Sequence, residues 1–170
     1  AYQIPFGGGQ IDMSISKFSS NGASLLYSTY IGGSDNEQPS SLVVNSQGEL
    51  VILGTTSSTD FPITANAFDN SFAGGPFINY PQNGLTYNNG SDIVVTVLNS
   101  SGTGLSGSTF VGGTGNDGLN DAVNLHYNYG DQFRGEVIVN AQDEIYVASS
   151  TRSNDFPLAG SSYQSTLNGT

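Results

Sequence analysis

The chain has 170 residues, with 14 acidic side chains against 3 basic ones and a formal net charge of −11. This charge argues against nucleic acid and anionic membrane surfaces as partners, because polyanions are repelled. The absence of cysteine excludes disulfides and thiolate metal sites. Only 10% of the residues are charged, and 23 glycines together with many Ser, Thr and Asn favour short strands joined by polar turns. No apolar stretch is long enough to span a membrane.

Four short β-prone runs occupy the first part of the chain: Ile11–Phe18, Leu25–Ile31, Leu42–Val44 and Leu50–Leu53. The first run alternates apolar and polar side chains, and the segment Ser19–Gly22 after it is typical of a hairpin turn. Gly32 and Gly33 break the pattern after the second run, and Ser46–Gly48 supplies the next turn. The pattern predicts short antiparallel strands.

The same four runs return later: Ile93–Leu98, Leu105–Val111, Val137–Val139 and Ile145–Ala148. Ser28–Gly33 matches Ser108–Gly113 at an offset of 80 residues, whereas Asp60–Pro62 matches Asp155–Pro157 at an offset of 95. An insertion in the second unit, at about 119–135, explains the larger offset. Internal similarity at a fixed offset is the sequence signature of a repeat architecture.

We divide the chain into a first unit at 1–66, a second unit at 67–161 and the start of a third at 162–170. Because Ala1–Gln3 corresponds to both Ala67–Asp69 and Ser162–Gln164, the two ends fall at the same phase of the unit. We therefore expect an excerpt of a longer array. The segment 73–90, rich in Gly, Pro, Asn and Tyr, is expected to form a long surface loop.

The segments Leu25–Gly33 and Thr55–Pro62 closely resemble the bacterial seven-bladed β-propeller repeat family, the SBBP-type repeats. The resemblance implies a large exported, often cell-surface bacterial protein and no shared chemistry. With four strands in each unit, we expect each unit to form one propeller blade, so that the chain makes about two blades of a larger propeller. The structural repeat motif consists of Gly32, Gly33, Asp60, Phe61, Pro62, Gly112, Gly113, Asp155, Phe156 and Pro157.

No residue pattern indicates catalysis or a nucleotide cofactor. His126 is the single histidine, so it has no partner of its own kind for a metal site. Two Gly-x-Gly-x-x-Gly strings, Gly102–Gly107 and Gly113–Gly118, lie in turn contexts without a following helix, which argues against dinucleotide binding. Asp60 and Asp155 are equivalent in the repeat, so we assign both to turns in which a carboxylate accepts backbone N–H groups. We expect a protein that is not an enzyme.

Calcium is the one metal ligand that the sequence leaves open. Hard oxygen donors cluster on glycine-rich loops of both units, without the spacing of an EF-hand. Solvated acidic turns are the alternative interpretation. The candidate donors are Asp35, Glu37, Asp117 and Asp121.

Aromatic side chains in the two insertions are the candidate ligand contacts. They either stack on a sugar or a protein partner, or pin the long loops onto the strands, and we favour the packing role. These residues are Phe77, Tyr80, Tyr87, Tyr127 and Tyr129.

These features favour a non-catalytic segment of an extracellular or cell-surface bacterial protein that acts in binding, adhesion or scaffolding. Its expected partners are a protein or glycan at the cell surface and the remaining blades of the parent chain. The alternatives are a carbohydrate-binding or carbohydrate-cleaving propeller, or a subunit of an extracellular filament.

Overall fold

The computed structural model describes residues 1–80, 84–120 and 135–167. Within these ranges all regular structure is β and no helix occurs, as the composition predicted. None of the described segments forms a helix long and apolar enough to cross a membrane. The strands are β1 (Met13–Phe18), β2 (Leu25–Ile31), β3 (Glu37–Val44), β4 (Leu50–Thr56), β5 (Ile78–Tyr80), β6 (Leu85–Tyr87), β7 (Asp92–Leu98), β8 (Leu105–Val111), β9 (Glu136–Val139) and β10 (Ile145–Ala148).

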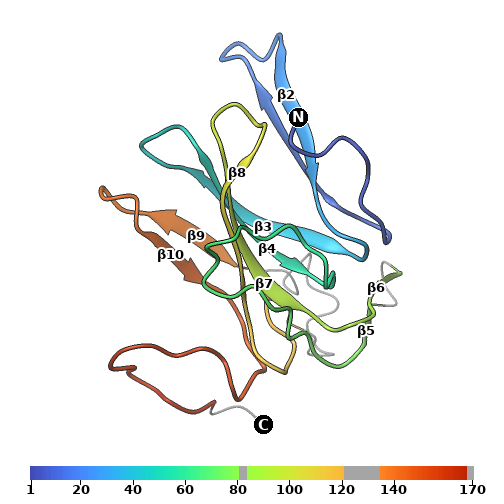
Figure 1. Ribbon diagram of the computed structural model, residues 1–170, viewed down its shortest axis with the longest axis vertical. Coiled ribbons are helices and arrows are strands. Elements are labelled where there is room, and N and C mark those ends of the chain that lie inside the picture. Colours follow the sequence, from blue (N-terminus) through green and yellow to red (C-terminus); the bar gives the residue numbers. More distant parts are fainter. Residues whose placement is uncertain (81–83, 121–134, 168–170) are drawn as a thin grey trace.

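The central sheet is a four-stranded antiparallel meander in the order β3-β4-β7-β8. The hairpin β1-β2 lies on one side of it and the hairpin β9-β10 on the other (Figure 1). The eight predicted strands are therefore confirmed. The expectation that the four strands of one unit form one sheet is wrong, because β4 of the first unit pairs with β7 of the second.

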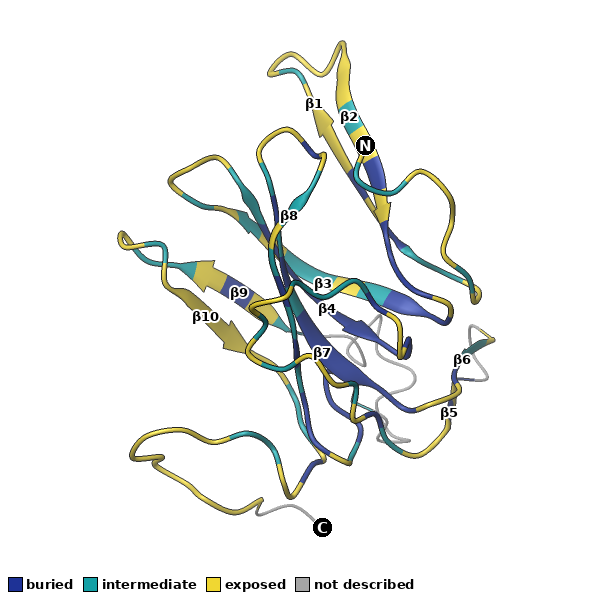
Figure 2. Ribbon diagram, viewed as in Figure 1, coloured by how far each residue is buried: buried dark blue, intermediate teal, exposed yellow. Residues whose placement is uncertain are grey.

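The two middle strands of the central sheet explain this pairing. From Val51 to Thr56 every residue of β4 is buried, and β7 is buried at most of its positions (Figure 2). By contrast, β1 alternates buried and exposed residues only at its start. Strands with apolar residues on both faces are stable only between two layers, so β4 and β7 form the middle of the sheet.

Each face of the central sheet carries its own hydrophobic core. Ile52 of β4 and Val94 of β7 pack with Met13 and Ile15 of β1. On the opposite face, Val51 and Leu53 of β4 pack with Ile93 of β7 and Val137 of β9. Since neighbouring residues of a strand point to opposite faces, one central sheet joins three layers.

The segment 73–90 contains a hairpin where the sequence predicted a loop. β5 pairs with β6, and Gly84, directly before β6, adopts a positive φ of 72°. The rings of Tyr80 and Tyr87 meet edge to face with centroids 6.2 Å apart, and both side chains are fully buried with Ile78 and Leu119. The alternation of apolar residues in this segment was the sequence signal for the two strands. It was overlooked because the many Gly and Asn residues are typical of a loop.

Candidate functional site

The glycine pair that follows β2 is held by a cluster of polar side chains, here named the first turn cluster: Gly32, Gly33, Glu37, Thr56, Ser58 and Asp60. Glu37 is fully buried. Its Oε2 accepts the Gly33 N–H at 3.1 Å, and its Oε1 accepts the hydroxyls of Thr56 at 2.6 Å and Ser58 at 2.5 Å. Asp60 accepts both the N–H (2.8 Å) and the hydroxyl (2.9 Å) of Ser34. These carboxylates join the turn after β2 to the end of β4.

An equivalent second turn cluster lies after β8: Gly112, Gly113, Asp117, Thr151, Ser153 and Asp155. Asp117 is fully buried and accepts, through Oδ2, the Gly113 N–H at 2.8 Å and the Ser153 hydroxyl at 2.7 Å. Asp155 accepts the N–H of Thr114 at 2.9 Å and its hydroxyl at 3.2 Å. The two repeats therefore use corresponding acids for corresponding contacts.

The glycines of these turns leave no room for a side chain. A Cβ on Gly32 would come within 2.5 Å of Glu37 Oε2 and 2.6 Å of Asp12 Oδ1. On Gly112 it would meet Asp92 Oδ1 at 2.5 Å and Asp117 Oδ2 at 2.9 Å. Two carboxylates thus face the same small space beside each glycine.

The second acid of each pair holds the segment before its strand. Asp12 accepts the N–H of Gly7 at 2.6 Å. Asp92 accepts the N–H groups of Ala73 at 2.7 Å and Gly74 at 3.0 Å. Sequence reasoning did not single out Asp12 and Asp92, although their equivalence at the offset of 80 residues is a signal that would have found them.

Burial favours the neutral forms of three acids: Glu37, Asp92 and Asp117. It raises the pKa of Glu37 to about 7, and the charge of Asp12 acts in the same direction, while hydrogen bonds from Ser58, Thr56 and Gly33 favour ionisation. Burial raises the pKa of Asp92 to about 6, with the charge of Asp117 adding to the effect. Burial also raises the pKa of Asp117.

Asp60 and Asp155 behave differently because they are exposed. The backbone N–H of Ser34 holds the pKa of Asp60 below its usual value, and that of Thr114 does the same for the pKa of Asp155. In both turns the Phe-Pro pair follows: Phe61 N donates to Ser58 O, and Phe156 N to Ser153 O, each at 3.4 Å. Phe61 is buried in the core beneath β8.

The calcium candidates do not converge. Asp35 accepts the amide of Asn88 at 3.1 Å, while Glu37 and Asp117 lie in different turn clusters and accept N–H and O–H donors. Asp121 lies outside the described residues. Among the residues that the structure describes, no group of three or more acidic or histidine side chains is placed to share a cation.

The aromatic candidates separate into two kinds. Tyr80 and Tyr87 are packed inside the β5-β6 hairpin, whereas the Phe77 side chain is 60% exposed. Tyr127 and Tyr129 lie outside the described residues. Only Phe77 therefore presents a described aromatic surface of these loops to solvent.

Phe77 lines an open pocket of 410 Å³ between the start of β5 and the second turn cluster. Its polar walls come from three exposed residues, Thr114, Arg152 and Asn154. Asn116 forms the floor, where its side-chain amide donates to Pro76 O at 3.1 Å and its oxygen accepts the Ser91 N–H at 3.1 Å. The pocket combines an aromatic ring, an amide, a hydroxyl and a guanidinium.

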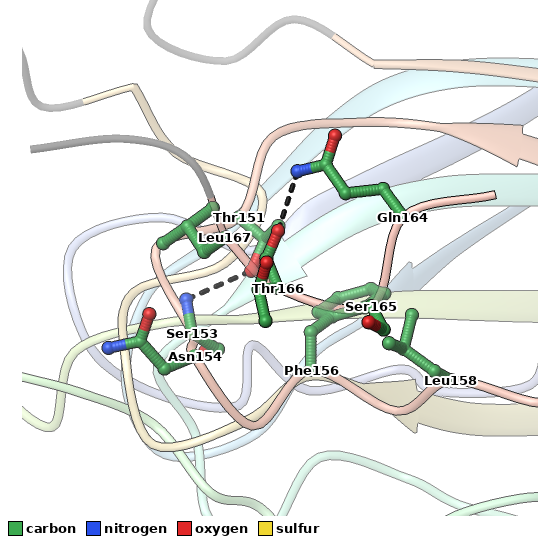
Figure 3. Close-up of a pocket in the computed structure, with 9 residues that line it drawn as sticks. All are labelled: Thr151, Ser153, Asn154, Phe156, Leu158, Gln164, Ser165, Thr166 and Leu167. Atoms are coloured by element: carbon green, nitrogen blue, oxygen red, sulfur yellow. Dashed lines mark hydrogen bonds between the residues drawn. The ribbon is translucent and has the colours of Figure 1, made fainter. Parts of the chain in front are cut away.

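A second pocket of 150 Å³ lies between the turn after β10 and the C-terminal segment (Figure 3). Phe156, Leu158 and Leu167 give it an apolar lining, and Gln164 at its rim donates to Thr166 O at 2.6 Å. Among the described residues that line it there is no acidic, basic or histidine side chain. Its composition suits an apolar side chain better than a polar ligand.

No family model, curated protein or solved structure matches this chain.

Proposed function

We propose that the chain is a non-catalytic β-propeller repeat segment of an extracellular or cell-surface bacterial protein, acting in binding, adhesion or scaffolding. The observation that carries this proposal is the duplication of the turn clusters. Corresponding acids, Glu37 and Asp117, accept corresponding N–H and O–H groups. A reaction centre requires a particular acid at one place, whereas a repeated frame requires the same contact in every unit.

Interpretation of the sheets as consecutive propeller blades rests on their layering. The hairpin β1-β2, the central meander and the hairpin β9-β10 pack face to face through two separate cores. The first strands of neighbouring sheets, β3 and β9, also contact each other. Sheets that approach most closely at one edge are what a radial arrangement of blades requires. Further blades are the partners that this arrangement calls for.

A carbohydrate ligand at the Phe77 pocket is the specific form of binding that the structure favours. Sugar rings stack on exposed aromatic side chains, and their hydroxyls bond to amides and hydroxyls such as those of Asn154 and Thr114. Arg152 contributes a basic side chain to the pocket wall, on a chain of strong negative charge. A cleaving activity has no comparable support, since the buried acids of both turn clusters hold backbone and hydroxyl groups.

A glycan array followed by calorimetry tests this proposal. We expect the chain to bind a subset of glycans, and Phe77→Ala to weaken that binding roughly tenfold, because one stacking surface is lost. Phe68→Ala is the matched control, since Phe68 is also well exposed, by 71%, but does not line the pocket. Equal affinity of the wild type and Phe77→Ala, or no bound glycan at all, would refute a carbohydrate site here.

A further inference from the structure

Two strand edges of the chain correspond to edges that pair in the central sheet. In the described residues, β10 has β9 on one side and no strand on the other, and β1 pairs only with β2. In the repeat, β10 corresponds to β4, and β1 corresponds to β7. Since β4 and β7 pair over seven residue pairs, one chain carries both halves of the same strand pair, at opposite sides.

The backbone groups of both edges point outward at matching positions. Asn140 N donates to Glu144 O at 3.1 Å, so alternation along β10 turns the N–H of Tyr146 toward β9 and that of Val147 outward. Tyr30 N donates to Gln3 O at 3.1 Å, away from β1, so Ser16 of β1 also directs its N–H outward. Unpaired edges of this kind are templates for another strand.

The side chains next to these edges also match. In the core, Val43 of β3 packs in the same cluster as Val137 and Val139 of β9. Ile138 corresponds to Val43, while Leu42 and Val44 correspond to Val137 and Val139. These counterparts are exposed: Ile138 by 62%, Leu42 by 56% and Val44 by 58%.

A groove of 540 Å³ lies where the missing contact belongs. It lies between β1 and the exposed face of β3, so it borders the free edge of β1 directly. Its apolar lining comes from Ile15, Phe18, Leu42, Val44 and Leu50. A hairpin with an outward strand edge and an apolar face fits such a groove, and β9-β10 is a hairpin of that kind.

We propose that two copies of this chain associate head to tail, with β10 of one copy pairing antiparallel to β1 of the next. The register follows that of β4 and β7, in which Val51 faces Val97 and Ile52 faces Thr96. Ile138 of the first copy then covers Leu42 and Val44 of the second. The expected facing residues are Ile145 and Phe18, Tyr146 and Lys17, Val147 and Ser16, and Ala148 and Ile15.

The pocket of Figure 3 supplies a further complementary surface. In the central sheet, Phe110 lies 6.3 Å from Phe61 and 5.8 Å from Phe72, ring centroid to centroid. Tyr30 corresponds to Phe110, and Phe156, which lines the pocket, corresponds to Phe61. Docking as proposed brings Tyr30 of the second copy to Phe156 of the first.

The incoming copy brings its own N-terminal segment. Its Phe6 ring already packs edge to face against Tyr30, with the ring centroids 6.2 Å apart. This N-terminal segment corresponds to Ser162–Leu167 of the first copy. Ser162–Leu167 is exposed throughout, so its displacement removes little packing. Because each chain has one edge of each kind, the contact is heterologous and repeats into a ring or an open array. This association uses surfaces separate from the Phe77 pocket and does not depend on glycan binding.

Sedimentation velocity of two proline variants, alone and mixed, tests the proposal. Val147→Pro blocks the outer edge of β10, and Ser16→Pro that of β1, while each N–H that pairs inside the hairpin stays in place. We expect the wild type to form species larger than a monomer that grow with concentration. Each variant alone should be a monomer, and their mixture should give a dimer and nothing larger, because only one productive contact remains.

The mixture also controls for folding, since each variant must present its intact surface to the other. Phe77→Ala is the matched surface control and should assemble like the wild type. A wild type that stays monomeric at every concentration overturns the proposal. So does assembly of either proline variant alone, or a mixture that remains monomeric while the wild type assembles.

Engineered cysteines test the register, because the chain contains none. Lys17→Cys in one copy and Tyr146→Cys in another should form a disulfide-linked dimer, since facing residues of a non-hydrogen-bonded pair have the closest Cβ atoms. Lys17→Cys mixed with Val147→Cys is the control, shifted by one residue onto the opposite face. Equal cross-linking of both mixtures would overturn the proposed register.

Discussion

The first and second turn clusters perform the same task with acids of different length. Glu37 divides its contacts between two oxygens, with Oε2 on the Gly33 N–H and Oε1 on the hydroxyls of Thr56 and Ser58. Asp117, one methylene shorter, serves both the Gly113 N–H and the Ser153 hydroxyl through Oδ2. The glycines and hydroxyls of the turn are thus the same in both clusters, while the length of the acid differs between them.

The difference also affects the charge of the clusters. Burial raises the pKa of Glu37 to about 7, whereas beside the second cluster burial raises the pKa of Asp92, the neighbour of Asp117, to about 6. Each unit thus contains a buried carboxyl that resists ionisation. Both repeats thus contain a pair of neighbouring acids, Asp12 with Glu37 and Asp92 with Asp117. The member whose pKa is raised most need not be the same in the two pairs.

The largest expected effect is a rise in stability as the pH falls. Above about pH 7 Glu37 and Asp92 are ionised in both folded and unfolded chains; as the pH drops through their folded pKa values, only the folded chain takes up protons. Glu37 alone should contribute about 3 kcal/mol between about pH 8 and about pH 5. Urea unfolding across this range measures the change.

The variant Glu37→Gln should flatten the first part of this pH dependence and leave the part due to Asp92. Gln142→Asn, in an exposed turn, is a control without a buried acid. If the wild type loses stability from about pH 8 to about pH 5, the carboxyls are ionised in the folded chain and the pKa values of both clusters are not raised.

Alanine at the crowded glycines should have the next largest effect. Gly32→Ala and Gly112→Ala should each lower the free energy of unfolding by about 2 kcal/mol, because the new Cβ would lie within 3 Å of two carboxylate oxygens that must move. Gly107→Ala in β8 is the matched control, since its nearest neighbour there is Val97 Cγ2 at 3.7 Å. Equal Tm values for the three variants would show that the turns relax without cost.

Strand positions could be predicted from the sequence because they depend on local alternation and turn residues. Sheet pairing could not, because the partner of β4 lies beyond the β5-β6 hairpin, and nothing local distinguishes pairing with β1 from pairing with β7. The near-continuous apolar runs at Val51–Leu53 and Ile93–Val95 were the available signal for middle strands.

The turn clusters were only partly visible for the same reason. Gly32 and Asp60 stood out because they recur as Gly112 and Asp155, but Thr56 and Ser58 resemble many other hydroxyl residues of this chain. Their equivalents Thr151 and Ser153 recur at the offset of 95 residues, so the repeat would have identified them. Burial of the acid between them depends on packing of the sheets, which no spacing encodes.

Exchanging the acid lengths should have a smaller effect and tests the comparison directly. Glu37→Asp withdraws the carboxylate from hydroxyls that it now reaches at 2.6 and 2.5 Å, so we expect a loss of about 1 kcal/mol. Asp117→Glu should cost a similar amount through crowding beside Gly112. Chemical denaturation measures both, and a neutral result for both would mean that acid length is not matched to its cluster.

The smallest effect is expected at the exposed acids of the two turns. Asp60→Asn and Asp155→Asn keep an oxygen that accepts the N–H of Ser34 or Thr114. They remove only the negative charge of the carboxylate, whose pKa the hydrogen bond lowers. Water screens both carboxylates, so each variant should lower Tm at neutral pH by less than Glu37→Asp does. The difference should vanish in acid, where the wild-type carboxyls are protonated as well. A larger loss than that of Glu37→Asp would place the anchor of the turns at their surface rather than in the buried pair, because the exposed charge would then contribute more than the buried hydrogen bonds.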